Sequence, residues 1–358
     1  MEKENLTQNK SEKRMLIKNI CWTLISFALS ALTIFVVLTE TKVFSLKDVF
    51  YEIKEGNTVY FIIAIFCMLL FIASEGEAIR CILKKISKPI KHRKGFFYSC
   101  ADIYFSAITP SASGGQPATL FFMIKDGIPL SVCSICLLLN LFMYNCAIVF
   151  IGIICVLFKN SIFINHSVLG KALIIIGFVM LSGLMIFFFL LIKKPDWVKK
   201  IGLFLCDLLH KLKLLKNKKI LENKIEKTIE KYSIISENIL NEKTFMLKIF
   251  GFNLFQRCIQ ISIAVFVYLG IDGSVNNISN VWFAQAFSVI GSNCVPIPGA
   301  VGVIDYLMLE GFGQFMDVEM AAHTEIISRA TNFYICIIVS LITVLIGYFR
   351  SKKNSNYS

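Results

Sequence analysis

Charged residues are scarce in this chain of 358 residues: 17% are charged and 56% are hydrophobic. Soluble domains contain roughly 45–50% apolar residues, and the mean hydropathy of +0.68 is far above theirs. This composition excludes an ordinary soluble protein and predicts an integral membrane protein. The remaining charge is unbalanced, at +13. Because the Lys and Arg clusters adjoin apolar runs, we expect them to face an anionic membrane surface and expect no nucleic acid partner.

Histidine is also rare. No metal constellation is visible among the four histidines, and we expect neither a metal nor a cofactor. The twelve cysteines lie almost entirely within apolar runs and are read as small core residues. A phosphate-binding loop of the Gly-Lys-Ser/Thr type is missing from the sequence, which makes ATP an unexpected direct driver. The histidines are His92, His166, His210 and His323.

Six apolar runs are long enough to cross a bilayer as helices, which takes about 20 residues. The sequence therefore predicts an all-α, polytopic membrane protein. We expect a disordered basic N-terminus at 1–15, one transmembrane domain at 16–350 and a tail at 351–358. Within the domain, residues 193–243 are expected to form an amphipathic helix or helical hairpin. The six runs are Ile17–Leu38, Tyr60–Ile79, Leu130–Phe158, Leu169–Ile192, Met246–Leu269 and Ala330–Phe349.

The distribution of Lys and Arg predicts the orientation of these spans. Residues 1–18, the basic block 80–94, the region 193–248 and the C-terminal tail together carry 29 of the 37 Lys and Arg residues. These segments are therefore expected on the cytoplasmic side. Both termini are then expected to face the cytoplasm.

Two further apolar segments are interrupted by helix-breaking residues. Ser106–Ala118 contains two prolines, two adjacent glycines and several hydroxyl residues, and Gly291–Gly302 again combines two prolines with glycines. The orientation requires the segment at 96–128 to enter and leave on the cytoplasmic side, and the segment at 281–328 to do so on the outer side. The helical flanks are short for full spans. We expect two re-entrant helical hairpins of opposite insertion, as in transporters built from an inverted repeat.

Non-helical backbone at membrane depth must be buried in protein or line a wet cavity. In each hairpin the second half-helix would begin near the membrane centre. Two helix N-termini that converge there favour an anion, because their free amides and dipoles attract negative charge. In this protein the expected anion is a lipid phosphate. The alternative is that these residues only allow tight packing or a kink. The candidate binding residues are Thr109, Ser111, Ser113, Gly114, Gly115 and Gln116 in the first turn, and Pro298, Gly299 and Gly302 in the second.

Charged residues inside apolar segments are costly and mark functional sites by default. Arg257 lies about halfway along its span and is a candidate counter-charge for a phosphate. Glu75 and Asp305 are the other candidates, and the alternative for each is structural pairing between helices. Glu77 is expected to pair with Arg80, three residues later on the same helix. We also expect Ser111 and Ser113 to cap the second half-helix of the first hairpin.

Both turns and the order of the spans resemble the flippase-like family that includes the transmembrane region of lysylphosphatidylglycerol synthases. The residues that carry the resemblance are Thr109-Pro110, Gly114-Gly115, Lys125 to Leu130 and Pro296 to Asp305. The resemblance covers roughly residues 15–350. It implies a bacterial membrane protein that handles phospholipids or lipid-linked head groups. Family members fused to a synthase domain aminoacylate phosphatidylglycerol and flip the product outward, which gives resistance to cationic antimicrobial peptides.

Three functions are consistent with these features. The first is a translocase, or flippase, for anionic or aminoacylated phospholipid. The second is a phosphatidylglycerol lysyltransferase, against which we note that the longest non-membrane stretch is about 50 residues, short of the usual domain size of about 100–150. The third is a proton-coupled small-solute transporter that uses Glu75 or Asp305. The expected partner is membrane phospholipid; a second copy of the chain and a separate synthase are left open.

Overall fold

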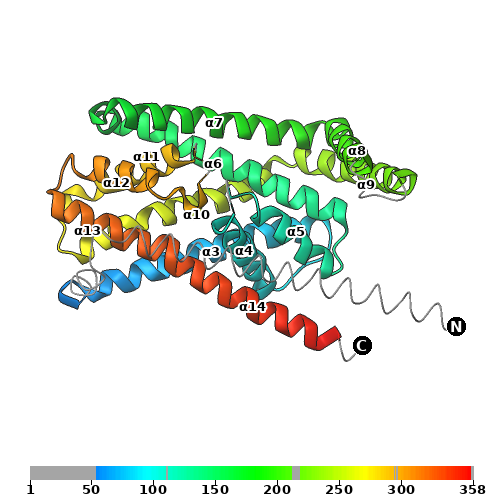
Figure 1. The fold of residues 1–358 in the computed structure, drawn as a ribbon, viewed down its shortest axis with the longest axis horizontal. Coiled ribbons are helices and arrows are strands. Elements are labelled where there is room, and N and C mark those ends of the chain that lie inside the picture. The colour runs from blue at the N-terminus through cyan, green and yellow to red at the C-terminus, as the bar shows by residue number, and fades with distance from the viewer. Residues whose placement is uncertain (1–53, 110–111, 212–217, 294, 296, 356–358) are drawn as a thin grey trace. The chain divides into compact units, whose positions relative to one another are not determined.

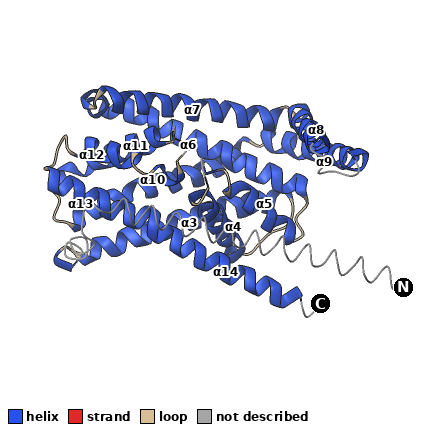
Figure 2. Ribbon diagram, in the orientation of Figure 1, coloured by secondary structure: helices blue, strands red, loops and turns tan. Residues whose placement is uncertain are grey.

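The computed structural model describes residues 54–109, 112–211, 218–293, 295 and 297–355, and within these ranges it contains helices and no strand (Figure 2). The predicted all-α polytopic fold is confirmed. The N-terminal region 1–15 and the predicted first span, 17–38, lie outside the described residues.

Five helices of the described part are long and apolar enough to cross a membrane. They correspond to the other five predicted spans. The last one begins at Val318, not at Ala330 as predicted, because Asp317 accepts a hydrogen bond from the Met320 amide and caps a helix there. A π-helical turn then carries this helix onward without a break. The five are α3 (Thr58–Ile86), α6 (Leu130–Asn165), α7 (Val168–Lys193), α10 (Lys243–Gly270) and the run of α13 (Val318–Arg329), η5 (Ala330–Ile335) and α14 (Cys336–Ser355).

Two pairs of shorter helices stand between these spans. At a rise of 1.5 Å per residue, the four helices are about 15–24 Å long, shorter than a hydrocarbon core of about 30 Å. In Figure 1 the first pair extends from the end of the bundle where α3 finishes and α6 begins, and the second pair extends from the opposite end. This arrangement supports two re-entrant hairpins of opposite insertion. The pairs are α4 (His92–Ala107) with α5 (Gly115–Lys125), and α11 (Ile278–Ser292) with α12 (Val303–Phe312).

Each hairpin packs against a long helix through glycine. A Cβ atom on Gly76 of α3 would lie 2.7 Å from the backbone of Gly95 in α4, and one on Gly177 of α7 would lie 2.1 Å from the carbonyl oxygen of Ile290 in α11. Such close backbone contact is a common way to pack helices in a membrane, where no hydrophobic effect drives their association. Both hairpins are therefore held tightly against the bundle.

Two further helices lie within the region 193–243. They are α8 (Pro195–Lys211) and α9 (Lys218–Asn241), which pack on each other. An ion pair of 2.8 Å joins Lys199 to Glu226, and its hydrogen bond raises the pKa of the lysine. Helix α9 also contacts the bundle, because the Tyr232 hydroxyl donates to the Leu191 carbonyl at 3.0 Å.

Candidate functional site

The first turn is closed by a threonine. Thr109 Oγ1 donates to the Phe105 carbonyl at 2.6 Å and accepts from the Gly114 amide at 2.8 Å. It thereby joins the end of α4 to the start of α5, whose N-cap is Gly114. The predicted cap at Ser113 is wrong, because Ser113 lies one residue before the N-cap. Ser111, the other predicted cap, lies outside the described residues.

A carboxylate of the protein lies at the start of α5, where the sequence analysis placed a lipid phosphate. Gln116 Nε2 donates to Asp102 Oδ2 at 2.9 Å. A Cβ atom on Gly115 would lie 2.1 Å from Asp102 Oδ1, so only glycine allows this approach. The positive end of the half-helix favours a negative group here. In this structure Asp102 supplies it.

Glu75 lies on α3 next to this carboxylate. Its side chain is buried, and its Oε2 accepts hydrogen bonds from Ser99 at 3.2 Å and from Gln256 at 3.1 Å. Asp102 lies three residues after Ser99 on α4 and interacts electrostatically with Glu75. The structure therefore brings the predicted residues Glu75, Gly115 and Gln116 together through Asp102. Glu77 is on another face of α3, and its predicted pairing with Arg80 is confirmed at 2.6 Å.

Arg257 lies near the middle of α10 and is 8% exposed. Its guanidinium lies over the ring of Tyr144 at 4.1 Å and near that of Phe71 at 5.2 Å. One terminal nitrogen donates to Gln260 of the same helix, and the buried Nε has no hydrogen-bond partner. Within the described part of the chain, no carboxylate forms an ion pair with it. Arg257 is thus a buried positive charge held by aromatic rings and one amide.

The second turn depends on backbone conformations that favour glycine. Pro298–Ala300 forms a 3₁₀ turn in which Gly299 has φ of +64°, and Gly302, with φ of +82°, is the N-cap of α12. The prediction that these two glycines open the second half-helix is confirmed for Gly302, whereas Gly299 lies in the separate 3₁₀ turn before it. The Gly302 amide donates to Asp305 Oδ2 at 2.8 Å. As in the first hairpin, a carboxylate of the protein occupies the start of the half-helix.

Asp305 is also paired with an arginine. Arg329 Nε lies 2.7 Å from Asp305 Oδ1, and Arg329 Nη2 donates to the Gly299 carbonyl at 3.1 Å. The π-helical turn after Arg329 places the Phe333 ring 4.9 Å from its guanidinium. Glu325 interacts electrostatically with both Asp305 and Arg329 and completes the cluster. The sequence analysis missed Glu325, although its position four residues before Arg329 on one helix is a signal for such a pair.

The two broken segments come into contact. Helix α4 of the first hairpin touches the 3₁₀ turn at Pro298–Ala300. The sequence analysis expected the second half-helices to face each other; the described contact is made by the first half-helix of the first hairpin. The two turns also share a pattern of charge: Asp102 interacts with Arg257, and Asp305 is paired with Arg329.

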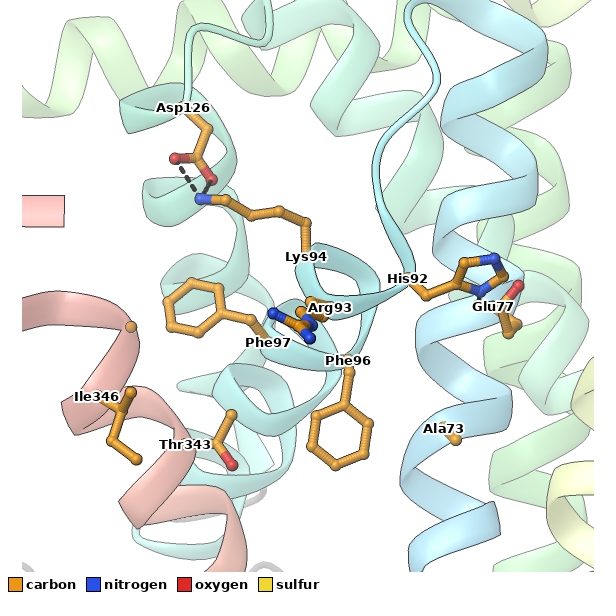
Figure 3. A pocket seen from close by; sticks show the side chains of 11 residues that line it. Ala73, Glu77, His92, Arg93, Lys94, Phe96, Phe97, Asp126, Thr343 and Ile346 are labelled. Carbon is orange, nitrogen blue, oxygen red and sulfur yellow. Dashed lines mark hydrogen bonds and ion pairs between the residues drawn. The ribbon is translucent and has the colours of Figure 1, made fainter. Parts of the chain in front are cut away.

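A cavity of about 1010 Å³ lies beside α4 at the end of the bundle that carries the basic block 80–94. Figure 3 shows Lys94 turned toward Asp126 and His92 toward Glu77. The Lys94–Asp126 ion pair measures 2.7 Å, whereas Arg93 forms no ion pair with any described residue. The rest of the lining comes from α3, α4 and α14 and is mostly apolar: Ala73, Phe96, Phe97, Thr343, Ile346 and Gly347.

This cavity combines a charged rim with an apolar wall, as an amphiphile requires. The sequence analysis did not find it. The available signal was the direct succession of the basic residues 91–94 and the aromatic residues Phe96 and Phe97, but the contribution of α14 depends on tertiary packing.

Comparison with known proteins supplies one match. The family model described as the lysylphosphatidylglycerol synthase TM region matches residues 23–340. No curated protein matches the chain. The matched region includes both broken segments, Arg257 and Arg329, and it ends before the cavity residues Thr343, Ile346 and Gly347.

Proposed function

The chain belongs to the lysylphosphatidylglycerol synthase transmembrane-region family, and we propose that it is a translocase for anionic or aminoacylated phospholipid. It is a multi-pass membrane protein of a lipid-related family. The proposal adds the activity, a bacterial plasma membrane as its location, and cytoplasmic placement of the basic segments and both termini. In this role the protein moves the lipid head group between leaflets while the acyl chains stay in the bilayer.

The observation that carries the proposal is the state of Arg257. A buried charge without a partner is costly within a membrane, and Arg257 is 8% exposed with an Nε that lacks a hydrogen-bond partner. A phosphodiester anion matches its requirement, because guanidinium groups bind phosphate oxygens through two parallel hydrogen bonds. We assign Arg257 as the counter-charge of the lipid phosphate in transit.

The remaining predicted site residues line or build the path in this proposal. Thr109, Gly114 and Gln116 shape the first turn, and Pro298, Gly299 and Gly302 shape the second. The cavity at the basic end is a suitable place for a lipid to approach from the inner leaflet, with its phosphate at Arg93 and an acyl chain along Phe97. Ser111 and Ser113 stay candidates for polar contacts to the head group.

Reconstitution of the purified chain tests the activity. Labelled phosphatidylglycerol and its lysyl derivative are placed in one leaflet of proteoliposomes, and their appearance in the other leaflet is followed by quenching. We expect faster movement than in protein-free vesicles. A lack of acceleration for either lipid would overturn the proposal. Parallel incubation with lysyl-tRNA and phosphatidylglycerol separates this activity from lysyl transfer, for which we expect no lysyl-lipid product.

A further inference from the structure

We propose that Glu75 and Asp102 form a proton-binding site that couples lipid movement to the movement of one proton. The inference rests on the proposed function, because the site acts on the same arginine that receives the lipid phosphate. Its basis is the electrostatic interaction between the buried carboxyl group of Glu75 and the partly buried carboxyl group of Asp102, beside an arginine without an ion pair to any described residue.

The hydrogen bonds around Asp102 leave one oxygen without a donor. Gln116 serves Oδ2 at 2.9 Å, whereas Oδ1 is buried and has no hydrogen-bond partner. This oxygen lies so close to Gly115 that any larger residue there would collide with it. The carboxyl of Glu75 interacts electrostatically with Asp102, and it accepts a hydrogen bond at 3.2 Å from Ser99, which lies one helical turn before Asp102 on α4.

Two hydrogen bonds to Glu75 go to one of its oxygens. Ser99 and Gln256 both donate to its Oε2. Two ionised carboxylates are acceptors only, so they cannot hydrogen-bond to each other, and like charges in contact disfavour double ionisation. A hydrogen bond between Glu75 and Asp102 therefore requires a proton on one of them. The pair holds this proton inside the membrane bundle.

Three other titratable groups, on α4, α14 and α10, interact with the pair. Cys100 of α4 and Cys336 at the start of α14 interact electrostatically with Glu75, and Arg257 of α10 interacts with Asp102. Among these described groups Arg257 alone carries a positive charge. The charge of the carboxyl pair and the charge of Arg257 are therefore balanced against each other.

Charge balance gives the stoichiometry. Without substrate, one shared proton leaves the pair with a single negative charge, which offsets Arg257. When the phosphodiester of a lipid binds Arg257, it brings a second negative charge to a site where uncompensated charge is costly. Uptake of one more proton, from water on the side where the lipid binds, makes both carboxyl groups neutral. The lipid and this proton then leave together on the other side.

The test measures the final distribution of labelled phosphatidylglycerol in proteoliposomes that carry a pH gradient. For one proton per lipid, a gradient of about one pH unit should enrich the lipid up to about tenfold in the leaflet on the alkaline side, beyond the value in protein-free vesicles. A sodium gradient at equal pH should give no enrichment. Enrichment by sodium, or movement of lipid with no response to pH, would overturn the proposal.

Variants locate the effect. Glu75→Gln combined with Asp102→Asn removes the titratable pair, and its lipid distribution should no longer respond to the pH gradient. Asp102→Asn alone imitates the singly protonated pair and should keep the response. Glu319→Gln changes an exposed carboxylate of α13 and serves as the matched control with the wild-type response. A persistent response in the double variant would contradict the assignment.

The outcomes separate the two proposals. If the wild-type protein moves no lipid, the proposed function fails. If it moves lipid without regard to pH, the translocase stands and the proton site falls. The wild-type measurement decides this by itself, so the test does not depend on the folding of a variant.

Discussion

Two buried arginines, one at each broken segment, have different surroundings. Arg329 has an ion pair to Asp305 at 2.7 Å and a hydrogen bond to the Gly299 carbonyl at 3.1 Å. Arg257 has aromatic rings around it, one amide partner and an unpaired Nε. Both side chains are similarly shielded from water. The difference is therefore in their partners and not in their depth.

The comparison teaches that a shared layout supports different roles. At both turns a carboxylate of the protein takes the start of the second half-helix: Asp102 at α5 and Asp305 at α12. At the second turn the arginine is bound to that carboxylate and stabilises the turn. At the first turn the arginine is left available for an anion from outside the chain. We therefore place binding at Arg257 and stability at Arg329.

The largest effect is expected for Arg257→Gln. Loss of the charge-assisted contacts to the lipid phosphate should lower the initial rate of phosphatidylglycerol movement roughly 100-fold, since losing one partner of such a pair costs about 2–5 kcal/mol. The unfolding temperature of this variant should fall less than that of Arg329→Gln, because Arg257 has ring contacts, one amide partner and a nearby carboxyl pair but no ion pair to lose. A wild-type transport rate in this variant would remove the assigned role.

Arg329→Gln should act on stability. The change leaves the carboxylates of Asp305 and Glu325 without their positive partner and should cost about 3–5 kcal/mol, as for other broken buried pairs. Unfolding of the detergent-solubilised protein measures the loss. If the unfolding free energies of Arg329→Gln and Arg257→Gln change equally, the two arginines are not distinguished as described.

A smaller difference is expected between two glycines of the second turn. Gly299→Ala introduces a Cβ at 2.2 Å from the Phe333 ring and at a positive φ, whereas Gly302→Ala has a positive φ but no atom within 4 Å of the new Cβ. In Gly302→Ala the free energy of unfolding should fall only by the backbone strain that the new Cβ introduces, about 1–2 kcal/mol. In Gly299→Ala the free energy of unfolding should fall further, because the new Cβ also displaces the Phe333 ring that lies over Arg329. Equal unfolding free energies of the two variants would show that the Phe333 ring moves aside without loss of stability.

The smallest effects are expected at the cavity rim. Arg93→Gln removes the basic residue that has no ion pair, and should weaken the apparent affinity for anionic lipid about fivefold, since one such charge contributes about 1 kcal/mol near a membrane surface. Lys94→Gln breaks a partly exposed ion pair with Asp126 and should change the unfolding free energy by at most about 1 kcal/mol. The two variants are compared by measuring the transport rate as a function of the anionic lipid content. A larger loss of affinity in Lys94→Gln than in Arg93→Gln would show that Lys94, and not Arg93, binds the anion.

Features that depend on composition and chain direction are predictable from the sequence. Counts of Lys and Arg, with the helix breakers at Pro110, Pro117, Pro296 and Pro298, were sufficient to predict two hairpins of opposite insertion. Gly302 was placed correctly because a glycine with positive φ at a helix start is a local feature. Arg257 is recognisable because a charged residue within an apolar span can be seen in the sequence alone.

Other features depend on contacts between segments that are distant in the chain. The pairing of Glu75 with Asp102 joins α3 to α4, and the cavity needs α14 beside α4; neither leaves a local pattern. The cap of α5 was misplaced because Thr109, five residues earlier, closes the turn and makes Ser113 unnecessary as a cap. The last span begins earlier than predicted because the capping signal of Asp317 was not used.

The central claim is that Arg257 receives the phosphate of an anionic lipid. The most direct measurement is native mass spectrometry of the lipid retained by the purified wild-type protein, by Arg257→Gln and by Arg329→Gln, each supplied with the same mixture of anionic and zwitterionic phospholipids. The account predicts that the wild-type protein and Arg329→Gln retain anionic lipid and that Arg257→Gln does not. Equal retention of anionic lipid by Arg257→Gln and the wild-type protein would contradict it.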